Sequence, residues 1–260
     1  MSTALVTGAS SGIGRALARG LALRGHDLLL TARSAPALQS LADELRSVRG
    51  VRVETVAIDL SRPEAVEQLL RTAAERGLSI DVLVNDAGSG NFGDFADAKW
   101  EALAQILDLN VRALTELTHR LLPAMRARGS GQILMVASTA AFAPGPWTTV
   151  YAASKAYVLS LAQSLAVELE GSGVSLTILC PGRTETSFAE RSGWPKERQL
   201  RGKRALSADE VAESALRALE SGKRLCVPGA ANRILSLLLR SLPSSLAARA
   251  VGRLHRRVRE

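Results

Sequence analysis

The chain has 260 residues, of which 47% are hydrophobic and only 3% are aromatic. This length and composition exclude a disordered chain and suit one large α/β domain with an aliphatic core. The net charge is +8, but residues 229–260 hold seven arginines and one glutamate and so carry +6 of it. The rest of the chain is close to neutral, which argues against a nucleic-acid-binding surface.

Strand-like and helix-like segments alternate along the chain. Continuous aliphatic runs such as 175–179 are typical of parallel strands covered on both faces. The alternation predicts a Rossmann-type doubly wound parallel sheet of about seven strands with helices on both faces. Residues 1–228 are expected to form this domain, and 229–260 to extend it as a basic helical tail. Strands are expected near 3–7, 27–32, 51–58, 80–85, 132–137, 174–180 and 223–227, and helices near 12–25, 34–48, 62–76, 98–128, 152–171 and 207–221.

A glycine-rich turn, Gly-x-x-x-Gly-x-Gly from Gly8 to Gly14, separates the first strand from the first helix. Glycines permit a tight turn and close approach of the backbone to a pyrophosphate, and the helix that follows offers unpaired N–H groups. The spacing departs from the common Gly-x-Gly-x-x-Gly form, so the motif alone is a weak indication. Ligands of such sheets bind at the carboxyl ends of the strands, where we expect this turn, Asn85, Ser138 and Pro181.

Tyr151 and Lys155 are expected on one face of a helix, about one turn apart. A tyrosine is a weak acid at neutral pH, and a nearby ammonium group favours its phenolate. Ser138 can hydrogen-bond a substrate oxygen, so the set can transfer a proton while a nicotinamide transfers hydride. A tyrosine and a lysine four residues apart are common on any helix, so this prediction depends on the combination with Ser138 and the glycine turn.

Together these motifs resemble the short-chain dehydrogenase/reductase family over roughly residues 3–228. The family's Asn-Asn-Ala-Gly motif appears as Asn85-Asp86-Ala87-Gly88, and its serine, thirteen positions before the tyrosine, matches Ser138. The family's catalytic asparagine matches Asn110. The resemblance implies cofactor contacts from Gly8, Ser10, Ser11, Gly12, Ile13, Gly14, Asn85, Ala87, Gly88, Tyr151, Lys155, Pro181, Gly182, Thr184 and Thr186.

The resemblance implies an NAD(P)-dependent oxidoreductase that interconverts a carbonyl and an alcohol, with Tyr151 as general acid in reduction and general base in oxidation. Lys155 would lower the pKa of Tyr151 and bind the nicotinamide ribose, Ser138 would orient the reacting oxygen, and Asn110 would help hold a water in the proton relay. The alternative for Asn110 is a structural residue that bends the helix. Asp86 departs from the family motif because a carboxylate cannot donate a hydrogen bond. We therefore expect a rearranged link between strands and a tuned, still active site.

The cofactor prediction depends on the end of the second strand. Ala32 stands where the family usually has an acidic residue, which binds both ribose hydroxyls and selects NAD, and Arg33 follows it. An arginine can pair with a 2′-phosphate, so NADP(H) is predicted over NAD(H), with Arg33 as the main discriminator. The alternative is a solvated arginine. Asp59, with Leu60 beside it, resembles the residue that contacts the adenine amine, or it merely begins the next helix.

The substrate loops of this family follow the fifth and sixth strands, here 139–147 and 186–204. Their aromatic residues either favour an apolar substrate or anchor the loops: Phe142, Trp147, Phe188 and Trp194. The second loop is expected to be a lid. Its cations are expected on the solvated surface of that lid: Lys196, Arg198, Arg201, Lys203 and Arg204.

The tail, residues 229–260, predicts two amphipathic helices separated by Pro243. In the second helix, Leu246, Ala250, Leu254 and Val258 repeat every four residues, and arginines lie mostly on another face. The tail can pack on the enzyme, cap the substrate cleft or build a dimer interface. Packing or homo-oligomerisation is favoured, with peripheral contact to an anionic membrane surface as the alternative. The family is usually dimeric or tetrameric.

Cys180 and Cys226 each end an apolar run and fit neither a disulfide framework nor a zinc site. We predict two buried free thiols, no metal site and a reducing, cytoplasmic compartment. No apolar run reaches the length of a membrane span, and the first strand starts too early for a signal peptide.

The main alternative function is a non-catalytic dinucleotide-sensing protein of the same fold. Loss of the tyrosine or the lysine would favour it, and both are present. Epimerases and dehydratases of similar architecture have a larger C-terminal substrate domain, which the 32 residues after Pro228 cannot form.

Overall fold

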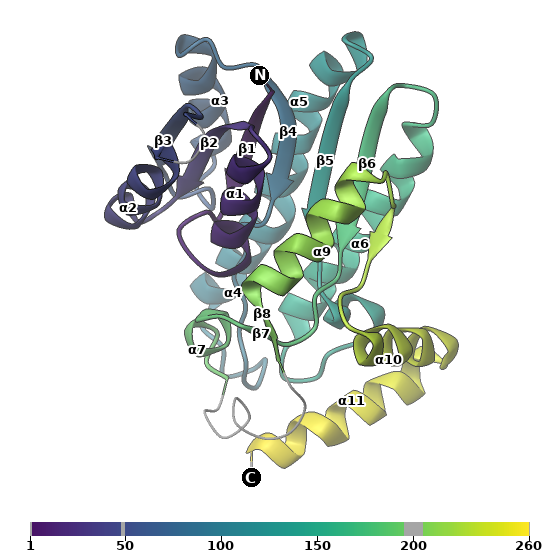
Figure 1. Ribbon diagram of the computed structural model, residues 1–260. Helices are drawn as coiled ribbons and strands as arrows, with labels where there is room; N and C mark the ends of the chain where they lie inside the picture. The colour runs from purple at the N-terminus through teal and green to yellow at the C-terminus, as the bar shows by residue number, and fades with distance from the viewer. Residues whose placement is uncertain (1, 48–49, 195–204, 260) are drawn as a thin grey trace.

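The computed structural model describes residues 2–47, 50–194 and 205–259. Seven parallel strands form its main sheet, in the order β3-β2-β1-β4-β5-β6-β9 (Figure 1). This order confirms the doubly wound sheet, and it reverses between β1 and β4, where such sheets bind ligands. The strands are β1 Thr3–Thr7, β2 Asp27–Ala32, β3 Val53–Ala57, β4 Ile80–Asn85, β5 Gly131–Val136, β6 Val174–Leu179 and β9 Leu225–Cys226.

Helices cover both faces of the sheet, so each strand buries alternate aliphatic side chains in two cores. In β1, Ala4 and Val6 face one core and Leu5 faces the other. Burial on both sides explains why the strands read as continuous aliphatic runs. The first core is closed by α1 Gly12–Leu23, α2 Ala35–Arg46 and α9 Ala208–Glu220. The second core is closed by α3 Ala65–Glu75, α5 Leu114–Ala127 and α6 Thr149–Glu168, and α4 Trp100–Leu107 packs against α6 (Figure 1).

The helix predicted at 98–128 is interrupted. A π-helical turn, Asp108–Ala113, lies between α4 and α5. One wider turn in an α-helix shifts the side chains after it, and such turns frequently occur at functional sites. This turn places Asn110 fully buried beside the loop that follows β4.

The segments around the sixth and seventh strands depart from the prediction in detail. β9 has two residues rather than the predicted five, because it pairs only with Ile178 and Leu179 of β6. Two short strands form a second, parallel sheet, β7 Thr184–Glu185 with β8 Leu206–Ser207. A single helical turn, α7 Phe188–Arg191, begins the predicted lid.

The tail forms two helices, α10 Ala230–Ser241 and α11 Ser244–Arg259, which lie beyond the carboxyl ends of the strands (Figure 1). His255 of α11 bonds through Nδ1 to the carbonyl oxygen of Pro146 at 2.7 Å, and Leu239 of α10 packs against one core. The predicted packing on the enzyme is therefore present. Ile234, Leu237 and Leu238 remain about 60% exposed on the outer side of α10.

Cys180 and Cys226 are free and buried, as predicted. Burial raises the pKa of the Cys180 thiol to about 12, which keeps it protonated and unreactive. None of the described helices is both long and apolar enough to span a membrane.

Candidate active site

The carboxyl ends of β1, β4, β5 and β6 border a cleft of about 730 Å³. It collects most of the predicted site residues from distant parts of the chain. Three predicted residues, Gly14, Asn85 and Asn110, do not line it. The predicted residues that do are Gly8, Ser10, Ser11, Gly12, Ile13, Arg33, Asp59, Leu60, Ala87, Gly88, Ser138, Tyr151, Lys155, Pro181, Gly182, Thr184 and Thr186.

The glycine turn fits the pyrophosphate of a dinucleotide. Gly8 and Gly12 have φ angles of 71° and 56°, which L side chains rarely adopt. The side chain of Ser11, which precedes α1, caps no backbone group, so the start of this helix offers N–H groups and a positive dipole end toward the cleft. A Cβ on Gly12 would lie 3.0 Å from Cγ2 of Thr186 on the opposite wall, so glycine keeps this entrance open.

Two predicted residues, Gly14 and Asn85, do not line the cleft and contact protein groups beneath its lining. A Cβ on Gly14 would lie 2.5 Å from Oδ2 of Asp86, so this glycine permits close packing and does not reach the cleft. Asn85 is buried, and its Nδ2 donates to Oγ1 of Thr118 at 3.0 Å. Both residues therefore have supporting contacts inside the protein, and their predicted contact with a cofactor stays a prediction.

Tyr151 and Lys155 of α6 meet Ser138, which follows β5, at the inner end of the cleft. Ser138 Oγ accepts from the N–H of Ala140 at 3.1 Å, and its hydroxyl lies near enough to Tyr151 to act on the pKa of that phenol. Lys155 is buried, donates from Nζ to the carbonyl oxygen of Val136 at 2.7 Å, and lies 6.0 Å from the centroid of the Tyr151 ring. The three side chains thus line the same cleft, with Lys155 held by Val136 rather than by Tyr151 or Ser138.

The direction of the Tyr151 pKa differs from the expectation. Burial raises the pKa of Tyr151, the Ser138 hydroxyl opposes this in part, and the charge of Asp86 raises it further. Lys155 does not reverse the effect, because its ammonium is bonded to Val136 and burial lowers its own pKa to about 8. At neutral pH the phenol of Tyr151 is therefore protonated in this structure.

Hydrogen bonds of the Asn110 side chain join the loop after β4 to α6. Its Oδ1 accepts from the N–H of Ser89 at 2.9 Å, and its Nδ2 donates to the carbonyl oxygen of Ser89 at 2.9 Å and to Oγ of Ser154 at 3.0 Å. Its side-chain amide is thus occupied by protein groups. This geometry supports the structural alternative for its side chain and does not place that side chain in the cleft.

Asp86 keeps the link between strands through its backbone. Its N–H and that of Ala87 both donate to Oγ1 of Thr7 at 3.0 Å, and this hydroxyl donates to the carbonyl oxygen of Val84. The carboxylate lies at the start of α1, against Gly14. Burial raises the pKa of Asp86 to about 7, although Lys155 and Gly14 act in the opposite direction.

This carboxyl is expected to make stability depend on pH. From about pH 4 to pH 7 the folded chain keeps a proton on Asp86 that the unfolded chain has lost, so the free energy of unfolding falls as pH rises. The fall is at most about 1.4 kcal/mol per pH unit, less where water enters the cleft. Lys155 acts in the opposite sense, but only above about pH 8.

Asp86→Asn is therefore expected to flatten the stability profile between about pH 5 and pH 7, measured by urea unfolding at several pH values. Asp97→Asn, at an exposed position, is the matched control and should leave the wild-type slope. Equal slopes for wild type and Asp86→Asn would show that Asp86 does not titrate in this range.

The residues that we predict to bind the adenosine part of the cofactor lie at the outer end of the cleft. Asp59 Oδ1 accepts from the N–H and the hydroxyl of Ser61 at 3.0 and 2.7 Å. Burial raises the pKa of Asp59, but these bonds and the charges of Arg33 and Arg62 outweigh it and hold the pKa below its usual value. Asp59 therefore forms a local turn rather than starting α3. Arg62, which the sequence analysis missed, lines a neighbouring cavity of about 480 Å³ together with Arg33 and Asp59.

The tail forms part of the lining of the cleft, one of the positions that its sequence left open. Leu235 and Leu239 of α10 line it, as do Leu254 and His255 of α11. The four-residue apolar repeat of the tail was visible in the sequence, but its docking position was not. The His255 ring lies edge-on to Trp194, with centroids 5.4 Å apart.

The predicted loop aromatics divide into two groups. Phe188 and Trp194 line the cleft, and the Phe188 ring centroid lies 5.5 Å from that of Tyr151. Phe142 and Trp147 do not line it: Trp147 donates from Nε1 to Asp94 at 3.1 Å, and so anchors its loop. The predicted lid cations, Lys196, Arg198, Arg201, Lys203 and Arg204, lie outside the described residues.

A doubly wound sheet with this cleft defines a dinucleotide-binding α/β protein. The family model for short chain dehydrogenases matches residues 2–196. Oxidoreductase UcpA of Escherichia coli is 39% identical over 189 residues, which cover 72% of this chain and 71% of that protein. The chain therefore belongs to the short-chain dehydrogenase family and is an oxidoreductase.

Solved structures agree with this family. A short-chain dehydrogenase from Sphingobium yanoikuyae in complex with NADPH has a TM-score of 0.83 and 33% identity, covering 94% of this chain and 98% of that one. The bulky-bulky ketone specific alcohol dehydrogenase from Comamonas testosteroni has a TM-score of 0.78 and 28% identity, covering 94% and 96%. A Burkholderia phymatum member in complex with NAD has a TM-score of 0.81 and 28% identity, covering 91% and 92%. These neighbours support a nicotinamide dinucleotide as the cofactor of this cleft.

Proposed function

We propose that this protein is a dehydrogenase/reductase that prefers NADP(H) and interconverts an apolar ketone and the corresponding secondary alcohol. The observation that carries the proposal is the cleft itself, which is lined by Ser138, Tyr151 and Lys155 and also by apolar tail residues such as Leu235, Leu239 and Leu254. These apolar tail residues can bind hydrocarbon surface in the same cleft as the groups that can move a proton.

In the proposed mechanism, a bound nicotinamide supplies or accepts the hydride. The hydroxyls of Ser138 and Tyr151 hold the reacting oxygen, and Tyr151 donates its proton to that oxygen during reduction. The raised pKa of Tyr151 suits this role, because the phenol is protonated at neutral pH. Lys155, whose Nζ donates to the carbonyl oxygen of Val136, would bind the nicotinamide ribose, as the family resemblance implies.

The NADP(H) preference rests on the charge at the outer end of the cleft. Arg33 lies close enough to Asp59 to lower the pKa of that carboxyl, and Arg62 acts on it in the same way. Two guanidinium groups near one ribose position favour a 2′-phosphate. Residue 32 is an alanine and so offers no carboxylate to repel that phosphate.

The test compares NADPH with NADH binding by fluorescence, followed by turnover of ketones of increasing apolar size, read at the reduced-nicotinamide absorbance band. We expect tighter binding of NADPH and kcat/KM values that rise with apolar bulk. Binding of a cofactor without turnover of any ketone or alcohol would favour a dinucleotide-sensing protein instead. Tighter binding of NADH would contradict the assigned preference.

Leu254→Ser tests the apolar lining of the cleft. Leu254 lines the cleft yet is 55% exposed, so a bound apolar substrate would cover it. We expect kcat/KM for bulky ketones to fall about tenfold through a higher KM, with cofactor affinity unchanged. Leu246→Ser is the matched control on the same helix: Leu246 is 49% exposed and does not line the cleft. Equal losses in both variants would assign the effect to the helix rather than to substrate contact.

A further inference from the structure

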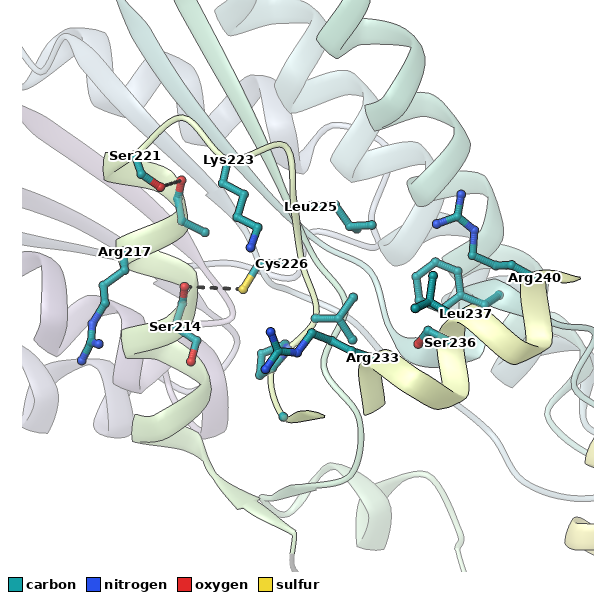
Figure 2. Close-up of a pocket in the computed structure, with 15 residues that line it drawn as sticks. Ser214, Arg217, Ser221, Lys223, Leu225, Cys226, Arg233, Ser236, Leu237 and Arg240 are labelled. Atoms are coloured by element: carbon teal, nitrogen blue, oxygen red, sulfur yellow. Dashed lines mark hydrogen bonds between the residues drawn. The ribbon is translucent and has the colours of Figure 1, made fainter. Parts of the chain in front are cut away.

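A second cavity lies on the other side of α10 from the active-site cleft. Its volume is about 450 Å³, and α9, the segment around β9 and α10 form its walls (Figure 2). It shares no lining residue with the active-site cleft. Leu235 and Leu239 of α10 face the cleft, whereas Arg233, Ser236 and Arg240 of the same helix face this cavity. One helix therefore separates two sites of different chemistry.

The described lining of this cavity contains four cations and no acidic residue: Arg217, Lys223, Arg233 and Arg240. Arg217 forms an ion pair with Glu213 at 2.7 Å, and Figure 2 shows its side chain extending away from the others. Within the described chain, Lys223, Arg233 and Arg240 have no ion-pair partner. The cavity therefore holds unneutralised positive charge.

Two of the four cations, Lys223 and Arg233, lie near Cys226 of β9. Burial raises the pKa of Cys226 on β9, and the charges of Lys223 and Arg233 oppose this, which places both cations near its sulfur. Figure 2 shows the Lys223 and Arg233 side chains directed toward Cys226. The Arg240 guanidinium lies 5.8 Å from the centroid of the Phe142 ring, which helps to hold it in place.

Ser236 provides an independent indication of a ligand. It is 4% exposed, lines the cavity, and its hydroxyl is buried without a hydrogen-bond partner among the described residues. A buried hydroxyl without a partner is unfavourable, so such groups usually bind a ligand or water. Lysine and arginine charges with a free hydroxyl match the acceptor oxygens of a phosphate group.

We propose that this cavity between α9, β9 and α10 is a binding site for a phosphate group, separate from the cofactor cleft. Arg233 and Lys223 supply the charge, and Ser236 donates a hydrogen bond. The phosphate can belong to a dissolved phosphomonoester or to an anionic phospholipid. The second source is consistent with Leu237, which lines the cavity and is 62% exposed, beside the equally exposed Leu238.

The first experiment measures glycerol phosphate binding to the full chain by calorimetry at low ionic strength, where charge interactions are least screened. The Lys223→Gln/Arg233→Gln double variant is expected to raise Kd at least about tenfold. The control, Arg71→Gln/Arg126→Gln, removes the same charge from two exposed positions on α3 and α5 and should bind as the wild type does. Equal weakening in both double variants would mean general charge attraction and would overturn the site.

Ser236→Ala separates an effect on binding from an effect on folding. It removes only a hydroxyl that has no partner within the described chain, so the variant is expected to fold as the wild type does. Its thermal stability should match or exceed that of the wild type, while Kd for glycerol phosphate should rise several-fold, roughly 3- to 10-fold. An unchanged Kd in both Ser236→Ala and the pocket double variant would overturn the proposal. Absence of glycerol phosphate binding to the wild type would overturn it as well, unless vesicles bind through the same residues.

Vesicle flotation distinguishes the two sources of the phosphate. Vesicles of phosphatidylcholine alone are compared with vesicles that also contain phosphatidylglycerol. Binding of the wild type only to the anionic vesicles, lost in the pocket double variant and kept in the control, would assign a lipid headgroup. Glycerol phosphate binding without vesicle binding would assign a dissolved phosphomonoester. Vesicle binding that the pocket variant retains, without glycerol phosphate binding, would contradict the site.

Discussion

Tyr151→Phe is expected to lower kcat for ketone reduction by about 10²- to 10⁴-fold, the range for loss of a positioned proton donor. The change removes the hydroxyl beside Ser138 and leaves the ring, which contacts Phe188. Cofactor affinity and thermal stability should therefore stay close to those of the wild type. Steady-state kinetics with a saturating ketone, together with fluorescence titration of NADPH, measure both quantities.

The matched control for this change lies on the same helix. Tyr157 is 39% exposed, and its hydroxyl lies 3.1 Å from Oγ1 of Thr115, away from the cleft. Tyr157→Phe should keep kcat within about twofold of the wild type, because a surface hydrogen bond contributes little. If Tyr151→Phe retained most of its activity, the proton would come from another group, and the proposed mechanism would be wrong.

Arg33→Asp is expected to reverse the cofactor preference. Loss of a charge-assisted bond to the 2′-phosphate, plus repulsion from the new carboxylate, should raise Kd for NADPH about 10²-fold or more. The same carboxylate can accept hydrogen bonds from the ribose hydroxyls of NADH, so the Kd for NADH should change little or fall. Fluorescence titrations of both cofactors with both proteins give the ratio of affinities.

Arg71→Asp makes the same change of charge at an exposed position of α3 that lines neither cavity at the cofactor end, and it should leave the ratio unchanged. An unchanged ratio in Arg33→Asp as well would remove Arg33 as the discriminator. Arg62→Asp would then be the next variant to measure, because Arg62 shares the outer cavity with Arg33 and Asp59.

Local sequence patterns predicted much of this fold, because each one reports a local physical constraint. The aliphatic runs predicted strands buried on both faces, and β1, β2 and β4 begin and end at the predicted residues. Ser207 and Glu210 form the capping box that begins α9, and Gly222 follows this helix with a φ of 66°. The glycine turn and the Ser138, Tyr151 and Lys155 set reach one cleft because parallel strands end at the same edge of the sheet.

The structure departs from the sequence-based predictions where contacts between residues distant in the sequence determine the local conformation or the pKa. The π-helical turn at Asn110 depends on hydrogen bonds to Ser89 and Ser154, which no local pattern contains. The direction of the Tyr151 pKa depends on how deeply α6 is buried and on the position of Asp86. Spacing along a helix places Tyr151 and Lys155 on one face, but it does not specify the desolvation of either group.

The sequence by itself therefore determined the doubly wound sheet, because aliphatic periodicity and glycine positions specify it. It also determined the family, through the resemblance of its motifs. Only the tertiary structure decided what the tail does. The same apolar repeat suits packing on the enzyme, a dimer or a membrane, since amphipathicity specifies that a face is covered but not by what. Docking of His255 on Pro146 and of Leu239 on the core makes α10 and α11 one wall of the cleft. That docking also leaves the opposite side of α10 to line the second, cationic cavity.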